Sequence, residues 1–243
     1  MVMAGHSKWA NIKHRKGAQD AKRGKIFTKI IKEITVAARL GGGDQDANPR
    51  LRKAVSNARS NNMPQENITR AIKKGTGELE GVNYEEMIYE GYGPLGIAIY
   101  MEVITDNKNR TVSELRHILN KHNGSLAEPG SVSWMFKRVR LIIMSLSSRD
   151  EEKLMRDVLE VEADDFDIVG EEVYVSVDQG KLITVKEGLE ELGYGVKSAE
   201  IIMTPNTLQK IEAPDKDKVL ELMDLIDSHD DVNQVFSNFS LSE

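Results

Sequence analysis

The segment between Arg138 and Met203 constrains the fold more than any other part of the chain, because its apolar pattern predicts six elements in a fixed order. Short runs rich in β-branched residues indicate strands, and apolar residues spaced three and four apart indicate helices. The elements are strand RLIIMSL, helix DEEKLMRDVLEV, strands DFDIV and VYVSV, helix KLITVKEGLEEL and strand KSAEIIM. This β-α-β-β-α-β order is typical of a ferredoxin-like domain.

The flanking segments predict that this domain is inserted in another one. Before it, the pattern predicts strands MIYEGYG and GIAIYMEVIT, the helix TVSELRHILNKH and a third strand SVSWMF. Thr111 and Glu114 have the spacing of a capping box at the start of that helix. After the insertion, the pattern resumes with strand LQKIE, helix DKVLELMDLIDSH and strand VNQVFSNF. We therefore expect a discontinuous α/β domain of residues 80–136 and 205–243, interrupted by residues 137–204.

The capping residues and the apolar spacing in residues 1–79 predict helices. Asn48 and Pro49 have the order of a helix cap followed by proline at the first helical position, and Gly75 closes a helix that opens after Pro64. In the helix that follows Gly24, apolar residues share one face, while Lys22, Lys25, Lys29, Lys32 and Arg39 lie within an arc of roughly 100° on the opposite face. The expected fold is therefore α+β and multi-domain: a three-helix bundle, with that cationic ridge facing outward, and two α/β domains.

Charge is divided unevenly along the chain, whose formal net charge is −6. Residues 1–75 contain 17 Lys and Arg against 5 Asp and Glu, whereas the rest of the chain contains 16 against 34. Such polarity indicates an anionic partner for the basic segment, with nucleic acid first and an anionic membrane surface second. The alternative is that the basic segment docks on the acidic remainder of its own chain.

Several kinds of chemistry find little support. The chain has no cysteine, which favours a reducing compartment, and no apolar run approaches the length of a membrane span, so we expect a cytoplasmic protein without a membrane partner. Gly91–Gly96 matches G-x-G-x-x-G, but a strand-like segment follows it, which favours a turn. The histidines and the acidic run Glu160–Asp167 lack metal-site spacing. No nucleophile–base motif is present, so we expect no enzyme, cofactor or metal.

The basic segment holds the candidate nucleic-acid-binding residues. Its cations can neutralise phosphates without reading the base sequence. Trp9 either stacks on an unpaired base or folds back on the bundle, and His14 either donates to a phosphate or caps the run. The candidates are Lys8, Trp9, Lys13, His14, Arg15, Lys16, Lys22, Arg23, Lys25, Lys29, Lys32, Lys73 and Lys74.

Several long motifs resemble the YebC/PmpR family, which includes the mitochondrial translational activator of cytochrome oxidase. They are AGHSKWANIKHRKGAQDAKRGKIFTK, NPRLR, NMPQENITRAIKKGTG, EGYGPLG, TDNKNRT and EPGSVSWMF. The resemblance implies a helical N-terminal domain and two α/β domains, one inserted in the other. It also implies a probable DNA-binding transcriptional regulator, or a factor that acts on the ribosome. The motif TDNKNRT adds Lys108 and Arg110 as a secondary contact.

Three hypotheses follow. The first is a non-enzymatic regulatory protein that binds the phosphate backbone of duplex DNA. The second is a ribosome-associated translation factor that uses the same cations on ribosomal RNA. The third is a protein-interaction module whose basic segment docks on its own body. The sequence shows no helix rich in base-reading side chains behind a clear turn, which favours backbone contact in the first two, and it leaves the oligomeric state open.

Overall fold

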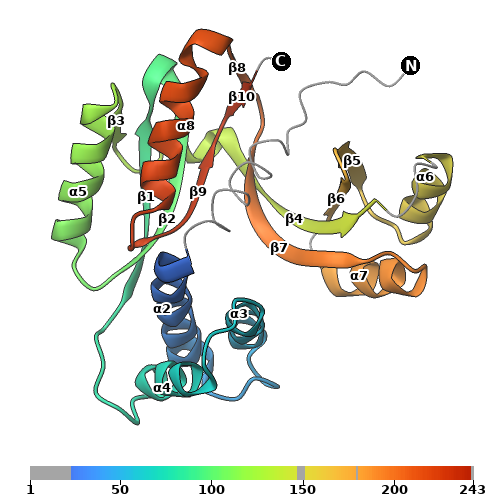
Figure 1. Cartoon of the computed structure of the whole chain (residues 1–243), viewed down its shortest axis with the longest axis horizontal. Coiled ribbons are helices and arrows are strands. Elements are labelled where there is room, and N and C mark those ends of the chain that lie inside the picture. The colour runs from blue at the N-terminus through green and yellow to red at the C-terminus, as the bar shows by residue number, and fades with distance from the viewer. Residues whose placement is uncertain (1–22, 147–150, 179, 242–243) are drawn as a thin grey trace. The chain divides into compact units, whose positions relative to one another are not determined.

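The computed structural model describes residues 23–146, 151–178 and 180–241, which belong to two compact units (Figure 1). One unit contains residues 23–132 and 214–236, and the other contains residues 133–213 and 237–241. None of the helices in these ranges combines the length and the apolar character needed to cross a membrane.

The first unit begins with three helices: α2 (Arg23–Gly41), α3 (Pro49–Ser60) and α4 (Gln65–Thr76). Their apolar faces meet in one core, in which Ile34, Leu51, Val55 and Ile68 are completely buried. The expected three-helix bundle is therefore present. The apolar spacing predicted from the sequence is the spacing that lines this core.

The helix ends confirm one prediction and correct another. The Asn48 side chain caps α3, because its Oδ1 accepts the Leu51 N–H at 3.0 Å while its Nδ2 donates to the Ala37 carbonyl at 2.8 Å. Gly75 does not end α4, which continues to Thr76 and is capped by Gly77 at φ +83°. Gly75 is instead a packing position, since a Cβ there would lie 2.4 Å from the Thr35 carbonyl oxygen of α2.

The same unit contains a four-stranded sheet of order β3-β1-β2-β9. The strands are β1 (Glu85–Tyr92), β2 (Ala98–Thr105), β3 (Ser125–Ala127) and β9 (Val232–Ser237), accompanied by helices α5 (Lys108–Lys121) and α8 (Ala213–Asp227). Strand β9 comes from the end of the chain and pairs with β2 from its middle. The sheet order thus confirms that a strand after the insertion joins the sheet that begins before it.

The G-x-G-x-x-G stretch is a turn, as predicted. Gly91 lies in β1, and the short 3-10 helix η1 (Pro94–Gly96) follows Gly93. Leu95 and Gly96 both have positive φ, at +62° and +77°, and strand β2 begins at Ala98. No α-helix follows these glycines, so the helix N-terminus that a dinucleotide pyrophosphate requires is absent from this turn.

Two predictions in this region are wrong. Helix α5 starts three residues before the expected capping box, with Asn107 as its cap: the Asn107 Oδ1 accepts the Arg110 N–H at 3.1 Å. The segment predicted as the third strand forms the 3-10 helix η2 (Ser133–Met135), and β4 begins only at Phe136. The third strand of the sheet is the shorter β3.

The second unit contains the ferredoxin-like order predicted from the sequence. Its elements are β4 (Phe136–Ser145), α6 (Glu151–Glu160), β5 (Asp165–Val169), β6 (Glu172–Val177), α7 (Leu182–Glu191) and β7 (Val196–Pro205). The sheet has order β5-β6-β4-β7, and all its neighbours are antiparallel. A parallel pair, β8 (Gln209–Ile211) with β10 (Phe239–Leu241), completes this unit. The fold class is therefore α+β with a ferredoxin-like domain. The proposed domain boundaries stay predictions.

Candidate nucleic-acid interface

The predicted binding residues fall into three groups. Trp9, His14 and the first cations lie outside the described residues, and Arg23 begins α2, where its side chain is not described. Lys25, Lys29 and Lys32 lie along α2, and Lys73 and Lys74 lie in the last turn of α4. Lys108 and Arg110 lie in the first turn of α5. The residues outside the described ranges are Lys8, Trp9, Lys13, His14, Arg15, Lys16 and Lys22.

The cationic ridge of α2 faces outward only in part: Lys25 and Arg39 are exposed, as predicted, whereas Lys29 and Lys32 are covered. Three of its ammonium groups contact the end of α8 and the residues that follow it: Lys25 Nζ donates to the Ser228 carbonyl at 2.9 Å, and Lys29 Nζ donates to the carbonyl of Asp227, the last residue of α8. Lys32 is 7 % exposed and donates to the Asp230 carbonyl at 2.9 Å and to Asp231 Oδ1 at 2.5 Å. Helical periodicity identified the face correctly, but the face is turned toward acceptors of the same chain.

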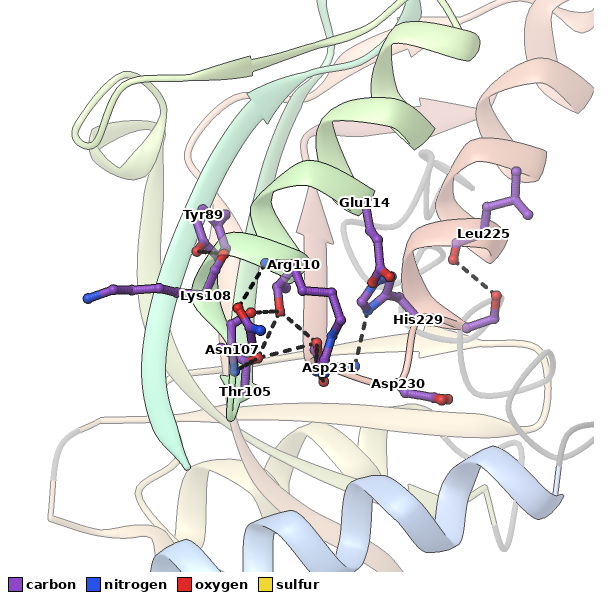
Figure 2. Close-up of polar contacts among 12 residues, drawn as sticks. Tyr89, Thr105, Asn107, Lys108, Arg110, Glu114, Leu225, His229, Asp230 and Asp231 are labelled. Carbon is purple, nitrogen blue, oxygen red and sulfur yellow. Dashed lines mark hydrogen bonds and ion pairs between the residues drawn. The ribbon is translucent and has the colours of Figure 1, made fainter. Parts of the chain in front are cut away.

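Asp231 is the centre of the polar cluster that receives Lys32. Its carboxylate is 3 % exposed and also accepts the Thr111 hydroxyl at 2.6 Å, the Thr105 hydroxyl at 3.3 Å and the Arg110 guanidinium at 3.1 Å (Figure 2). Thr111 lies inside α5, four residues after its Asn107 cap. The cluster therefore joins α2, β2, α5 and the segment after α8.

The electrostatics of Asp231 follow from these contacts. Burial opposes its ionisation, but hydrogen bonds from Lys32, Thr111 and Arg110 outweigh burial and lower the pKa of Asp231 from 3.8 to about 2. Conversely, the carboxylates of Asp106 and Asp231 raise the pKa of the Arg110 guanidinium. Asp231 is thus an ionised, buried carboxylate whose charge is compensated from two helices.

Glu114, His229 and Asp231 bring potential metal ligands within 4.8 Å of one another. The hydrogen bonds oppose a metal there. His229 Nδ1 accepts the Asp231 N–H at 3.1 Å, so in the neutral ring the hydrogen is on Nε2, which contacts Glu114 Oε2 at 2.9 Å. A metal at Nε2 would need the lone pair that this tautomer lacks, and the Asp231 oxygens already accept several donors. The arrangement is a hydrogen-bonded cluster.

Arg110 and Lys108 differ in their surroundings. Arg110 pairs with Asp106 at 2.7 Å as well as with Asp231, so its guanidinium is already neutralised within the chain. Lys108 is exposed, and its carbonyl accepts the Tyr89 hydroxyl at 3.4 Å (Figure 2). Of this predicted secondary contact, only Lys108 presents an exposed side chain away from the Asp231 cluster.

Three further cations on α3 were missed by the sequence analysis. Arg52, Lys53 and Arg59 are exposed and lie away from the face of α3 that buries Leu51, Ala54, Val55 and Ala58. Helix α3 contains no acidic residue, which is the signal that could have identified them.

We call Arg52, Lys53 and Arg59, together with Lys73 and Lys74 of α4, the α3–α4 cations. All five are exposed. None forms an ion pair with any residue in the described ranges. Arg50, in contrast, lies between Glu33 and Glu86, with N–O distances of 2.7 and 2.6 Å.

Comparisons with known proteins agree along the whole chain. Residues 7–78 match the family model described as the TACO1/YebC protein N-terminal domain, and residues 84–239 match the TACO1/YebC second and third domain. A probable transcriptional regulatory protein of Geobacter sulfurreducens is 54 % identical over 240 residues, covering 99 % of this chain and 97 % of the relative. One from Thermotoga maritima is 52 % identical over 242 residues, with 99 % and 95 % covered.

A solved structure also resembles this one. It is a conserved hypothetical protein of Aquifex aeolicus, 45 % identical, with a TM-score of 0.85 and 98 % of each chain covered. The agreement extends over the helical bundle and both α/β parts.

Proposed function

This chain belongs to the TACO1/YebC family, and from that premise we propose that it is a non-enzymatic regulatory protein that binds the phosphate backbone of duplex DNA through its basic N-terminal domain. Relatives that share about half of its residues are named probable transcriptional regulatory proteins. The names of these relatives do not mention DNA, so the inference that this chain contacts DNA rests on the distribution of charge in the bundle.

The observation that carries the proposal is the exposure of the α3–α4 cations. Five Lys and Arg side chains point away from the bundle core without an acidic partner among the described residues. Surfaces of this kind bind polyanions and release the counterions that phosphates hold. Because such contacts do not read bases, we expect affinity to depend on salt more than on sequence.

A salt titration tests this directly. Five phosphate contacts predict that the affinity for a fluorescent duplex falls roughly 500-fold between ~50 and ~200 mM salt. The charge-reversal pair Lys53→Glu with Arg59→Glu should weaken binding strongly at low salt. The control pair Lys121→Glu with Lys216→Glu changes the net charge equally on exposed positions of α5 and α8. An affinity independent of salt would remove the electrostatic basis of the proposal, and equal losses from both pairs would mean that net charge, and not the α3–α4 cations, governs binding.

The same cations could bind the phosphates of ribosomal RNA, so a second experiment must distinguish duplex DNA from the ribosome as the partner. Two results together would favour a ribosome-associated factor. The native protein would cosediment with ribosomes but bind duplex DNA weakly, and the Lys53→Glu/Arg59→Glu pair would abolish the cosedimentation. Crosslinking in cells followed by sequencing of bound DNA and bound RNA identifies the partner. Tighter binding to a promoter than to random duplex would add sequence specificity.

A further inference from the structure

We propose that the contact between α2 and residues 227–231 is an autoinhibitory latch, which keeps Lys29 and Lys32 of α2 from nucleic acid until a polyphosphate strand displaces it. The latch consists of Lys25, Lys29 and Lys32 on one side and the 227–231 segment on the other. This inference deepens the proposed function and rests on it.

The 227–231 segment supplies the kind of acceptors that a phosphate backbone supplies. Oxygens of this segment face the three α2 ammonium groups: carbonyls of Asp227, Ser228 and Asp230, and carboxylates of Asp227 and Asp231. Two of the carbonyls belong to the end of α8 or directly follow it, where the last peptide groups of a helix lack intrahelical donors and carry partial negative charge. Cations spaced along one helix face meet these acceptors in succession.

The latch and a nucleic acid exclude one another. Lys32 is 7 % exposed, and the Lys29 and Asp227 side chains are 13 % and 12 % exposed, so a phosphate cannot reach these ammonium groups while the segment covers them. Binding that uses them therefore requires α2 to leave the segment. The apparent affinity is then the affinity of the open form multiplied by the fraction of molecules in which the latch is open.

The connection between the bundle and the sheet is suited to such a movement. Residues 77–83, which join α4 to β1, are exposed throughout, and Gly77 lies at φ +83°. Further contacts of charged and polar side chains bridge the two parts: Arg50 pairs with Glu86, Arg39 donates to Asn83, and Lys32 lies 5.7 Å from the centre of the Tyr84 ring. Polar contacts of this kind yield to competing ions more readily than an apolar core does.

One pair of substitutions tests the latch through affinity. Asp227→Asn removes a carboxylate that lies 3.8 Å from Lys29, whereas Asp230→Asn removes an exposed carboxylate of the same segment whose carbonyl alone contacts α2. Both changes remove one negative charge. We expect Asp227→Asn to tighten duplex binding about two- to fivefold relative to Asp230→Asn, the range of a weak ion pair. Equal affinities of the two variants would overturn the inference.

A distance measurement tests the movement itself. The chain has no cysteine, so Thr69→Cys on α4 and Glu221→Cys on α8 place two spin labels at exposed positions of the full-length protein. We expect a second, longer distance between the labels when a random-sequence duplex is added to saturation. Duplex binding, measured by anisotropy, with an unchanged distance would overturn the latch alone. Absence of duplex binding in the native protein would overturn the proposed function and the latch with it.

Discussion

The α2 cations and the α3–α4 cations look alike in the sequence but have opposite surroundings in the structure. Both sets lie on the polar faces of amphipathic helices in one bundle. Lys29 and Lys32 are covered by acceptors of the same chain, while Lys53 and Arg59 are exposed and have no described acidic partner. Periodicity therefore identifies which face of a helix is polar, but it does not say what that face contacts.

This difference predicts that the two sets affect different properties. Removing a covered cation leaves a buried carboxylate with fewer donors, which costs stability. Removing an exposed cation leaves the native structure nearly unchanged and weakens only the attraction of a polyanion.

The largest effect is expected at Lys32. The substitution Lys32→Met keeps the length of the side chain but withdraws the 2.5 Å contact to Asp231 Oδ1, leaving Arg110 and the two threonines as its donors. We expect the free energy of unfolding to fall by about 3 kcal/mol. The matched change Lys53→Met on the exposed face of α3 should alter it by less than about 0.5 kcal/mol. Urea denaturation measures both, and similar losses for the two variants would contradict the comparison.

A smaller effect is expected from acid. Because the pKa of Asp231 is lowered to about 2 in the folded state, its ionised form stabilises the protein fully above pH 4, and this contribution is lost as the pH falls from about 4 to about 2. The lost contribution is on the order of 2 kcal/mol. The Asp231→Asn variant lacks the titrating group, so its stability should approach that of the native protein as the pH falls. A difference between the two that stays constant from pH 5 to pH 2 would argue against the lowered pKa.

Local patterns predicted much of the fold. The inserted domain follows from strand and helix periods that act over a few residues, and the Asn48 cap follows from one side chain placed before Pro49. Gly75 shows the limit of such rules, because its role is set by close approach of α4 to Thr35 on another helix. A glycine that permits packing and a glycine that ends a helix look the same in one sequence.

The Asp231 cluster could not be predicted for a related reason. Lys32, Thr111 and Asp231 are separated by many residues along the chain and meet only after the tail adds β9 to the sheet. Thr111 was also misread as a cap, since its spacing to Glu114 fits that motif as well as it fits the helix interior. The exposed cations of α3 were within reach, because a helix with several cations and no acid needs no tertiary contact to be noticed.

The smallest effect is expected from a single exposed cation. Arg59→Gln removes one positive charge from α3 without disturbing an ion pair among the described residues, so the free energy of unfolding should stay within about 0.5 kcal/mol of the native value. If Arg59 contacts one phosphate, the slope of log affinity against log salt becomes less steep by about 0.9, and the loss of affinity is similar for every duplex sequence. Lys216→Gln on α8 removes the same charge far from α3 in the sequence and should leave the slope unchanged. A slope that changes equally in both variants would mean that net charge, and not the α3–α4 cations, governs binding.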